Sequence, residues 1–366
     1  MAFSPEPAHQ HGMAARTGVL LVNLGTPDAP TAAALRRYLA EFLSDPRVVE
    51  IPRFIWMIIL HGIILRIRPA RSAAKYASIW LPEGSPLAVW TQRQQKRLQE
   101  QLDHAGLIIK TAYAMRYGNP SIASVLNQFK KDGVDRILFL PLYPQYASAT
   151  TGSVIDAVTH WATQQRRIPE MRFVNHYHDH PAYIQALAQQ VRQFWQANGM
   201  SERLLLSFHG VPERSLHLGD PYHCECHKTA RLLAEELAID PMRMKVTFQS
   251  RFGKAKWLGP YTEPTLIEWA KSGVKSVDVM CPGFTADCLE TLEEIHIEAR
   301  EAFLHAGGAQ FHYIPCLNDH SDWIAALAQI AQQHLQGWPI HAQDVAKDDQ
   351  RKMAQREHAL KMGAEN

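Results

Sequence analysis

Residues 19–25, VLLVNLG, form an apolar run that ends in a glycine, and residues 204–210, LLLSFHG, repeat the same arrangement. A short, continuous apolar run bounded by a turn signal is typical of a strand buried on both faces. Strands of that kind occur mainly in parallel sheets, whose two faces are both covered by helices. These two stretches therefore predict an α/β fold.

Strand-like runs alternate with segments of helical period through both halves of the chain. In the first half the expected strands are 19–25, 108–118 and 136–142, with helices around 31–43 and from Ser121. In the second half the expected strands are 204–210, 245–253 and 276–283, with helices from about Lys228 and from Pro264. This alternation predicts a parallel sheet with crossover helices in each half.

Short motifs also recur between the halves. NLGTP at 23–27 has the pattern of FHGVP at 208–212, and RYG at 116–118 returns as RFG at 251–253. Self-similarity of this kind indicates a duplicated unit. We therefore expect two similar Rossmann-like domains, each a parallel sheet flanked by helices, with a cleft between them.

The domain limits follow from the same pattern. We expect the first domain over 17–142 and the second over 143–321. A helix at 322–340 is expected to pack back on the first domain, and 341–366 reads as a polar tail.

Composition excludes several classes of protein. The 366 residues carry 38 Lys and Arg against 36 Asp and Glu, so the near-zero net charge disfavours nucleic acid as a partner. The amino-terminal segment has no apolar core of a signal peptide, and five cysteines form no disulfide framework. The most apolar run, 54–65, is too short to cross a bilayer. We expect a cytoplasmic protein.

Ligands of open parallel sheets bind beyond the carboxyl ends of the strands, and the two halves differ there. Where the first half has Leu24, the second has His209. Neither glycine that follows belongs to a GxGxxG or GxxxxGK[ST] motif, which disfavours a nucleotide-phosphate site. His209 is therefore either a structural strand-end residue or a catalytic one.

A row of carboxylates follows the last expected strand of the second half. Asp287, Glu290, Glu294 and Glu298 fall at i, i+3, i+7 and i+11, which is one face of a helix. Such a face is either solvated surface or a place where protons and divalent cations are handled. Asp287 and Glu290 are expected at the same edge of the sheet as His209, which favours the second interpretation.

Two histidine-rich segments invite a metal assignment. HCECH at 223–227, with His217 nearby, lacks the paired CxxC knuckles of common zinc modules. NHYHDH at 175–180 is expected to be an exposed, hydrogen-bonded patch. The sequence therefore predicts no structural zinc site in either segment.

Six motifs together resemble one known family. They are VNLGTP (22–27), YPQYASATTGS (143–153), SFHGVP (207–212), GDPY (219–222), WLGP (257–260) and FTADCLETLEEI (284–295). In this order, over about residues 19–325, they are similar to the ferrochelatases. That resemblance implies insertion of Fe(II) into protoporphyrin IX with release of two protons, as the terminal step of haem synthesis. It also implies two Rossmann-like domains around a porphyrin cleft.

The resemblance implies roles for individual residues. His209 matches the active-site histidine, which accepts pyrrole protons or contacts the metal, and Glu290 matches the catalytic glutamate that can also contact the metal. Glu294 and Glu298, with Asp287, match an acidic line suggested as a path for metal or protons.

Further positions match the porphyrin pocket of the family. Leu24, Arg116, Tyr117 and Trp257 correspond to residues that line or flank the macrocycle. Arg68 and Ser85 correspond to positions that contact the propionates, on a lip expected at about 50–85. Because the apolar run 54–65 is followed by Arg66, Arg68 and Arg71, this lip is also expected to rest on a membrane surface.

Departures from the family pattern limit the cofactors. Many members hold a [2Fe–2S] cluster on three carboxyl-terminal cysteines and one in the YPQY segment. Here residues 337–366 contain no cysteine, and Ser148 occupies the YPQY position. We expect no cluster and no permanently bound cofactor, with Fe(II) as a substrate, and we favour a monomer. Cys288 stands where animal members have a histidine.

Three other interpretations stay open at this stage. A coproporphyrin or cobalt chelatase would share the architecture, and a histidine and a glutamate do not identify the metal. A two-lobed, non-catalytic binding protein of the periplasmic type would need an export signal. A dinucleotide oxidoreductase would need the glycine fingerprint.

Overall fold

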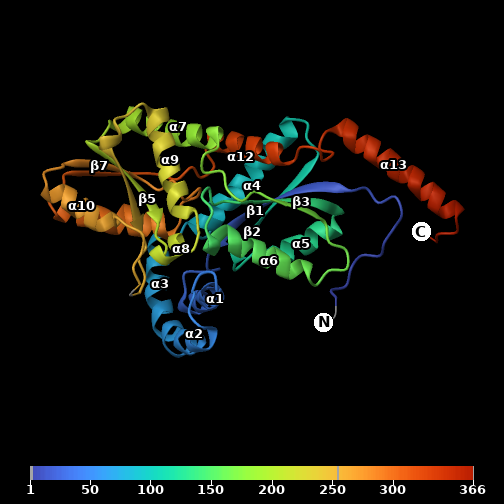
Figure 1. Cartoon of the computed structure of the whole chain (residues 1–366), viewed down its shortest axis with the longest axis horizontal. Coiled ribbons are helices and arrows are strands. Elements are labelled where there is room, and N and C mark those ends of the chain that lie inside the picture. Colours follow the sequence, from blue (N-terminus) through green and yellow to red (C-terminus); the bar gives the residue numbers. More distant parts are fainter. Residues whose placement is uncertain (1–2, 254, 366) are drawn as a thin grey trace.

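Two four-stranded parallel sheets form the framework of the molecule, of which this computed structural model describes residues 3–253 and 255–365. The first sheet has the order β2-β1-β3-β4, built from β1 (Arg16–Gly25), β2 (Ile109–Tyr117), β3 (Val134–Pro141) and β4 (Glu170–Phe173). The second has the order β6-β5-β7-β8, built from β5 (Arg203–His209), β6 (Met244–Gln249), β7 (Ser276–Met280) and β8 (Gln310–Ile314). Identical strand order confirms the predicted pair of Rossmann-like domains, which lie side by side (Figure 1).

Glycines after the first strand of each domain are required by the close approach of the neighbouring strand. A Cβ on Gly25, whose φ is +116°, would lie 1.8 Å from the carbonyl oxygen of Tyr117. A Cβ on Gly210 would lie 2.7 Å from the carbonyl oxygen of Gln249. The repeated motif in the sequence therefore encodes one repeated backbone contact.

Helices cover both faces of each sheet. In the first domain they are α1 (Ala32–Leu43), α2 (Arg53–Ile59), α3 (Leu65–Ile79), α4 (Pro86–His104), α5 (Ile122–Lys131) and α6 (Ser153–Ala162), with π-helices η1 (Leu60–Ile64) and η2 (Ser148–Gly152). In the second they are α7 (Pro181–Asn198), α8 (Glu213–His217), α9 (Tyr222–Leu237), the short η3 (Pro241–Arg243), α10 (Thr262–Lys271), the π-helix η4 (Glu290–Ala299) and α11 (Arg300–His305). Two helices, α12 (Ser321–His334) and α13 (Ala342–Lys361), end the chain. The α9 helix starts six residues before the expected Lys228, at the last residue of GDPY.

Local sequence explains where these helices begin and which face they bury. Ser121 precedes α5, and its hydroxyl accepts a hydrogen bond from the Ser124 N–H, which satisfies one free donor of the first turn. Ile122, Leu126 and Phe129 form its buried face against the first sheet.

One apolar cluster extends through both domains. It joins Leu21 of β1 to Leu206 of β5 and includes Leu187 of α7 and Trp323 of α12, all essentially inaccessible to solvent. The α12 helix contacts both α4 of the first domain and α7 of the second. A shared core of this kind fixes the two sheets relative to each other.

The expected boundary after residue 142 lies too early. The β4 strand (Glu170–Phe173) pairs in parallel with β3, so the first domain includes residues beyond 170. Its four residues are exposed or half-buried, which explains why no apolar run marked the strand. Residues expected to form a polar tail include the α13 helix, which extends away from the first sheet (Figure 1) and contacts it through the Arg16–Asp349 ion pair.

Candidate active site

His209 is the last residue of β5, and one of its ring nitrogens is fixed by the backbone. Its Nδ1 lies 2.6 Å from the carbonyl oxygen of Gly210. Because a carbonyl oxygen only accepts, Nδ1 must hold the proton of the neutral ring, and the lone pair of Nε2 is left for another partner. The half-buried imidazole is thus prepared to accept a proton or to bind a metal.

Gln249 connects the end of the His209 strand to the helix that begins at Glu290. It pairs with His209 in the parallel ladder and is buried. Its side-chain oxygen accepts a hydrogen bond from the Ser207 hydroxyl at 2.7 Å, and its amide donates to the Glu290 carbonyl oxygen at 2.7 Å. Sequence reasoning missed Gln249, although a polar residue closing an apolar strand is the same signal that identified His209.

Glu290 is the first residue of η4 and faces groups from α3. Burial raises the pKa of the Tyr76 phenol well above its usual range, and the charge of Glu290 raises it further. Desolvation lowers the pKa of Arg68, whereas the charge of Glu290 raises it. Within the described residues no ion pair engages the Glu290 carboxylate, so its charge is directed at Arg68 and at neutral phenols.

The acidic helix is a π-helix, and its carboxylates have separate partners. Glu294 accepts hydrogen bonds from the N–H and the hydroxyl of Ser250 at 2.7 and 2.5 Å. Glu298 pairs with Lys75 of α3 at 2.8 Å, and the same lysine contacts Glu293 at 2.8 Å. Because hydrogen bonds in a π-helix join i to i+5, Glu293 and Glu298 lie next to each other. The sequence had not singled out Glu293.

Asp287 does not lie on this helical face, contrary to expectation. The helix begins after it, and Asp287 belongs to the loop between β7 and η4. Its buried carboxylate accepts hydrogen bonds from the Tyr313 hydroxyl at 2.5 Å and the Asn318 amide at 2.6 Å. The side chain of Thr291 and the N–H of Cys316 also donate to it. Asp287 therefore holds the loop to β8.

Replacing Asp287 with Ala should lower the free energy of unfolding by about 3 kcal/mol or more, because hydrogen bonds to a charged group contribute about 1.5–3 kcal/mol each. Urea unfolding monitored by circular dichroism would measure the shift in midpoint. The exposed Asp103→Ala is the matched control, with an expected effect within about 0.5 kcal/mol. Normal stability with lost activity would instead place Asp287 on a metal or proton path.

Leu24 and Trp257 lie beside the two central residues. Leu24 is half-buried and packs against the cluster of Leu87, Ala286 and Cys288, which is close in sequence to Glu290. Trp257 is half-buried, and its indole lies directly against Gly210, the residue after His209. Both side chains can therefore contact a flat ligand placed between His209 and Glu290.

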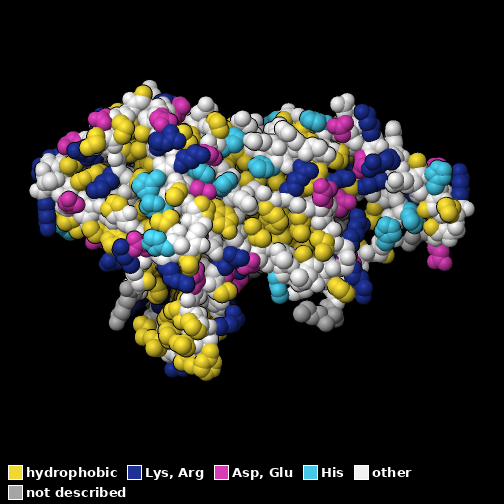
Figure 2. All heavy atoms as spheres, in the orientation of Figure 1, with side chains coloured by type: hydrophobic (Ala, Val, Ile, Leu, Met, Phe, Trp, Pro, Cys, Tyr) yellow, Lys and Arg dark blue, Asp and Glu magenta, His cyan; other side chains and the backbone are white. Residues whose placement is uncertain are grey.

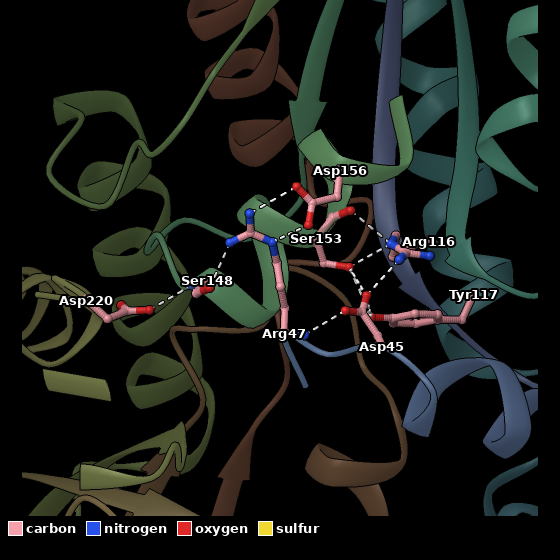
Figure 3. A network of polar contacts seen from close by, with 8 residues as sticks. All are labelled: Asp45, Arg47, Arg116, Tyr117, Ser148, Ser153, Asp156 and Asp220. Carbon is pink, nitrogen blue, oxygen red and sulfur yellow. Dashed lines mark hydrogen bonds and ion pairs between the residues drawn. The ribbon is translucent and has the colours of Figure 1, made fainter. Parts of the chain in front are cut away.

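Arg116 and Tyr117 are occupied by other partners. Arg116 forms an ion pair with Asp45 at 2.6 Å and donates to the Ser153 hydroxyl at 2.6 Å (Figure 3). Tyr117 is fully buried, and its hydroxyl donates to Asp45 at 2.8 Å. Burial raises the pKa of Asp45, but hydrogen bonds from Ser153, the Arg47 N–H and Tyr117 lower it overall. Both side chains are therefore engaged by Asp45 and Ser153.

The same network reaches the second domain. Arg47 donates to the Ser148 hydroxyl at 2.9 Å, and the Ser148 N–H donates to Asp220 at 2.7 Å (Figure 3). Ser148, the position at which some relatives place a cluster cysteine, is therefore a link between domains.

Ser85, expected on the lip as a contact for a propionate, is buried and has a partner within the protein. It precedes α4, and the Thr26 hydroxyl donates to its hydroxyl at 2.6 Å. Because Thr26 follows the Leu24–Gly25 turn, Ser85 fixes that turn from the protein interior.

Arg68 is exposed on α3 and contacts the second domain. Its guanidinium lies 4.9 Å from the ring centre of Phe252. With the Lys75 ion pairs, this contact holds α3 across the site.

Both the sequence and the fold of the chain are similar to those of known proteins. The family model described as Ferrochelatase matches residues 16–335. The chain is similar to proteins named Ferrochelatase from Methylibium petroleiphilum and from Polaromonas sp., each 65% identical over the full length of both chains. Among solved structures, SirB from Bacillus subtilis with Fe3+ matches with a TM-score of 0.51 and 13% identity, covering 87% of this chain and 95% of that one. At that identity the similarity concerns the fold.

Proposed function

The chain belongs to the ferrochelatase family, and from this premise we propose how its residues insert Fe(II) into protoporphyrin IX. It is a metal chelatase of haem synthesis, and the reaction replaces two pyrrole protons by one Fe(II). The observation that carries the assignment of roles is the Nδ1 contact of His209 with Gly210, which leaves Nε2 as a free base beside the Glu290 helix.

His209 and Glu290 act as the groups that receive the protons. The Nε2 lone pair of His209 takes a proton from one pyrrole nitrogen, and the Glu290 carboxylate provides the negative charge that favours Fe(II) and proton release. Gln249 acts as a positioning residue, because it ties the strand of His209 to the first residue of η4.

Metal entry also requires the flat ring to buckle. Leu24 and Trp257 are rigid or packed side chains beside Glu290 and His209, and a site shaped by them binds a saddled macrocycle better than a flat one. Arg68 supplies a positive charge for a propionate once its contact with Phe252 is broken.

In this proposal the porphyrin enters when α3 moves away from the second domain. That movement would break the contact of Arg68 with Phe252 and the ion pairs of Lys75 with Glu298 and Glu293. The contacts at the exposed Arg68 and Glu298 contribute about 0–1 kcal/mol each. The Glu293 carboxylate is buried, so breaking its ion pair costs more.

Protons leave along η4 in this proposal. Glu294 lies one turn after Glu290 and is bonded to Ser250, while Glu298 is about half exposed with 48% of its side chain accessible. Glu290, Glu294 and Glu298 therefore form a row of carboxylates along which protons can pass from the site to solvent. Asp287 is left out, because its hydrogen bonds are directed at β8 and the loop after it.

Anaerobic incubation of the protein with protoporphyrin IX and Fe(II) tests the function, read as the loss of free-base fluorescence and the appearance of haem absorbance. Turnover is expected with protoporphyrin. Turnover with coproporphyrin alone, or with Co(II) alone, would identify a related chelatase, and binding of porphyrin without any turnover would identify a binding protein.

The tip of α2 and α3 is a membrane-binding surface in this proposal. The large apolar side chains Phe54, Ile58, Ile63 and Ile67 are 55–80% exposed. Figure 2 shows hydrophobic side chains gathered at the end of the projection, where Figure 1 places α2. Residues 51–82 contain no acidic residue but include Arg53, Arg66 and Arg71. No helix in the described part of the chain is long and apolar enough to span a bilayer. The features fit peripheral contact with an anionic leaflet, on the cytoplasmic face.

The double substitution Phe54→Glu and Ile58→Glu should weaken vesicle binding by about 100-fold or more, since burial of each side chain contributes about 1.5–3 kcal/mol. Flotation with phosphatidylcholine vesicles that contain phosphatidylglycerol measures this partitioning. Met242→Glu, at another exposed apolar site, is the control and should bind as the wild type does. A wild-type protein that stays unbound would contradict the proposal.

We propose further that the protein needs no [2Fe–2S] cluster and acts as a monomer. The sequence contains no cysteine after Cys316, and the Ser148 hydroxyl is engaged by Arg47. Both sides of the site come from one chain, since His209 and Glu290 belong to the second domain and Leu24 to the first.

A further inference from the structure

Two histidines and a glutamate from distant segments meet at the junction of the domains. His176 and His178 lie in the loop after β4, and Glu225 lies in the first turn of α9. The Nδ1 atom of His176 is 2.6 Å from one carboxylate oxygen of Glu225, and the Nδ1 atom of His178 is 3.2 Å from the other. One nitrogen or oxygen from each of the three residues lies within 4.8 Å of the others.

We propose that His176, His178 and Glu225 bind a zinc ion that fastens the two domains, separate from the site of iron insertion. Two imidazole nitrogens and a carboxylate oxygen are ligands that Zn²⁺ takes in proteins. Bonds of about 2.0–2.2 Å place tetrahedral ligands about 3.3–3.5 Å apart, so the present separations need only a small adjustment. Three protein ligands leave the fourth position for water.

The state of His178 is an independent indication of a ligand. Its side chain is only 5% exposed, and its Nδ1 has no hydrogen-bond partner within the described residues. The Glu225 oxygen at 3.2 Å is close but unsuitably aligned for a hydrogen bond. A buried polar atom without a partner is costly, and a metal ion bound by this nitrogen would satisfy it.

The surroundings hold the proposed ligands in place. The Tyr146 N–H donates to the Glu225 carboxylate at 2.7 Å, and the Thr229 hydroxyl donates to the carbonyl oxygen of His178 at 2.8 Å. Hydrogen bonds of this kind orient metal ligands and increase affinity. Because Tyr146 and the histidines follow strands of the first sheet while Glu225 and Thr229 belong to α9, the ion would bridge the domains.

Neither histidine-rich segment could show this site alone. NHYHDH contributes two ligands and HCECH only Glu225, whereas His223 stacks on Phe248 with ring centres 5.7 Å apart. The expected exposed patch is thus wrong for His178. The sequence analysis predicted no structural zinc because neither motif alone has the spacing of a zinc site. The fold brings residues of both motifs together.

Zinc binding should be measured in the His209→Ala background, without porphyrin, so that a metal at the insertion site does not contribute. After treatment with a chelator, titration against a chromophoric zinc chelator gives stoichiometry and affinity. We expect one tight site and a rise in Tm of about 3 °C or more at a hundredfold excess over Kd.

Substitutions of the three proposed ligands test whether they bind the zinc ion. His178→Ala and Glu225→Gln should each weaken zinc binding by more than about 100-fold. Loss of a residue that only hydrogen-bonds a metal ligand costs about 10–100-fold, and loss of a ligand itself should cost more. His176→Ala should do the same without disturbing the core, since half of that side chain is exposed. The control pair His223→Ala and His227→Ala, on the same helix, should bind as before. Loss of binding in this control pair, unchanged binding in His176→Ala, or no zinc bound at all would overturn the proposal.

Discussion

Glu290→Gln is expected to lower the rate of haem formation by about 10²–10⁴-fold while protoporphyrin still binds with near wild-type affinity. Glutamine keeps the size of the side chain but removes the negative charge and the carboxylate that can accept a proton. Because the Gln249 amide donates to the backbone of residue 290 and not to its side chain, the start of η4 stays in position.

The measurement combines initial rates with porphyrin titrations by fluorescence. Glu301→Gln, at an exposed position of α11 further along the same helical segment, is the matched control and should retain full activity. A loss confined to porphyrin affinity, with the maximal rate unchanged, would remove Glu290 from the chemical step and leave it a role in binding.

Apolar periodicity predicted the fold because the strands that define it are buried on both faces. Residues 19–22 of β1 and 204–206 of β5 are almost inaccessible, so their sequences contain no polar interruption. The β4 strand was missed for the opposite reason. Its residues are half-buried or exposed, so they form no apolar run in the sequence. The strand is held in the sheet by its hydrogen bonds to β3.

Residues of the candidate site were predictable only where the local sequence departs from the pattern expected of a buried strand or an ordinary helix. His209 interrupts an apolar strand, and Glu290 lies in a row of carboxylates at helical spacing, so both can be recognised from the local sequence. Asp287 belonged to the same row by spacing, but the helix begins after it and its carboxylate is directed at Tyr313.

Partners that are distant in sequence leave no local signal. Arg116 of β2 pairs with Asp45 of the loop after α1, and Glu225 of α9 meets His178 of the loop after β4, because the fold brings these distant segments together. The spacing of residues in the sequence could not predict either pair. Similarity to family motifs suggests a role for such residues but does not reveal which side chains they contact.

His209→Ala is expected to reduce the rate of Fe(II) insertion by about 10²–10⁴-fold, again with porphyrin still bound. The substitution removes the Nε2 lone pair and also the contact between Nδ1 and Gly210, but the strand remains held by its ladder with β6 and by the Ser207–Gln249 hydrogen bond. The fold of β5 should therefore survive, which circular dichroism and the unfolding midpoint would verify.

Rescue separates a base from a structural residue. The variant lacks an imidazole at a half-buried position, so added imidazole should restore part of the rate in proportion to its concentration, whereas a loss caused by altered packing would not respond. His217→Ala, at an exposed position in α8, controls for the general removal of a histidine near the site and should keep wild-type activity. If His209→Ala turns over normally, Nε2 is not the proton acceptor, and Glu290 must serve both pyrrole protons in turn.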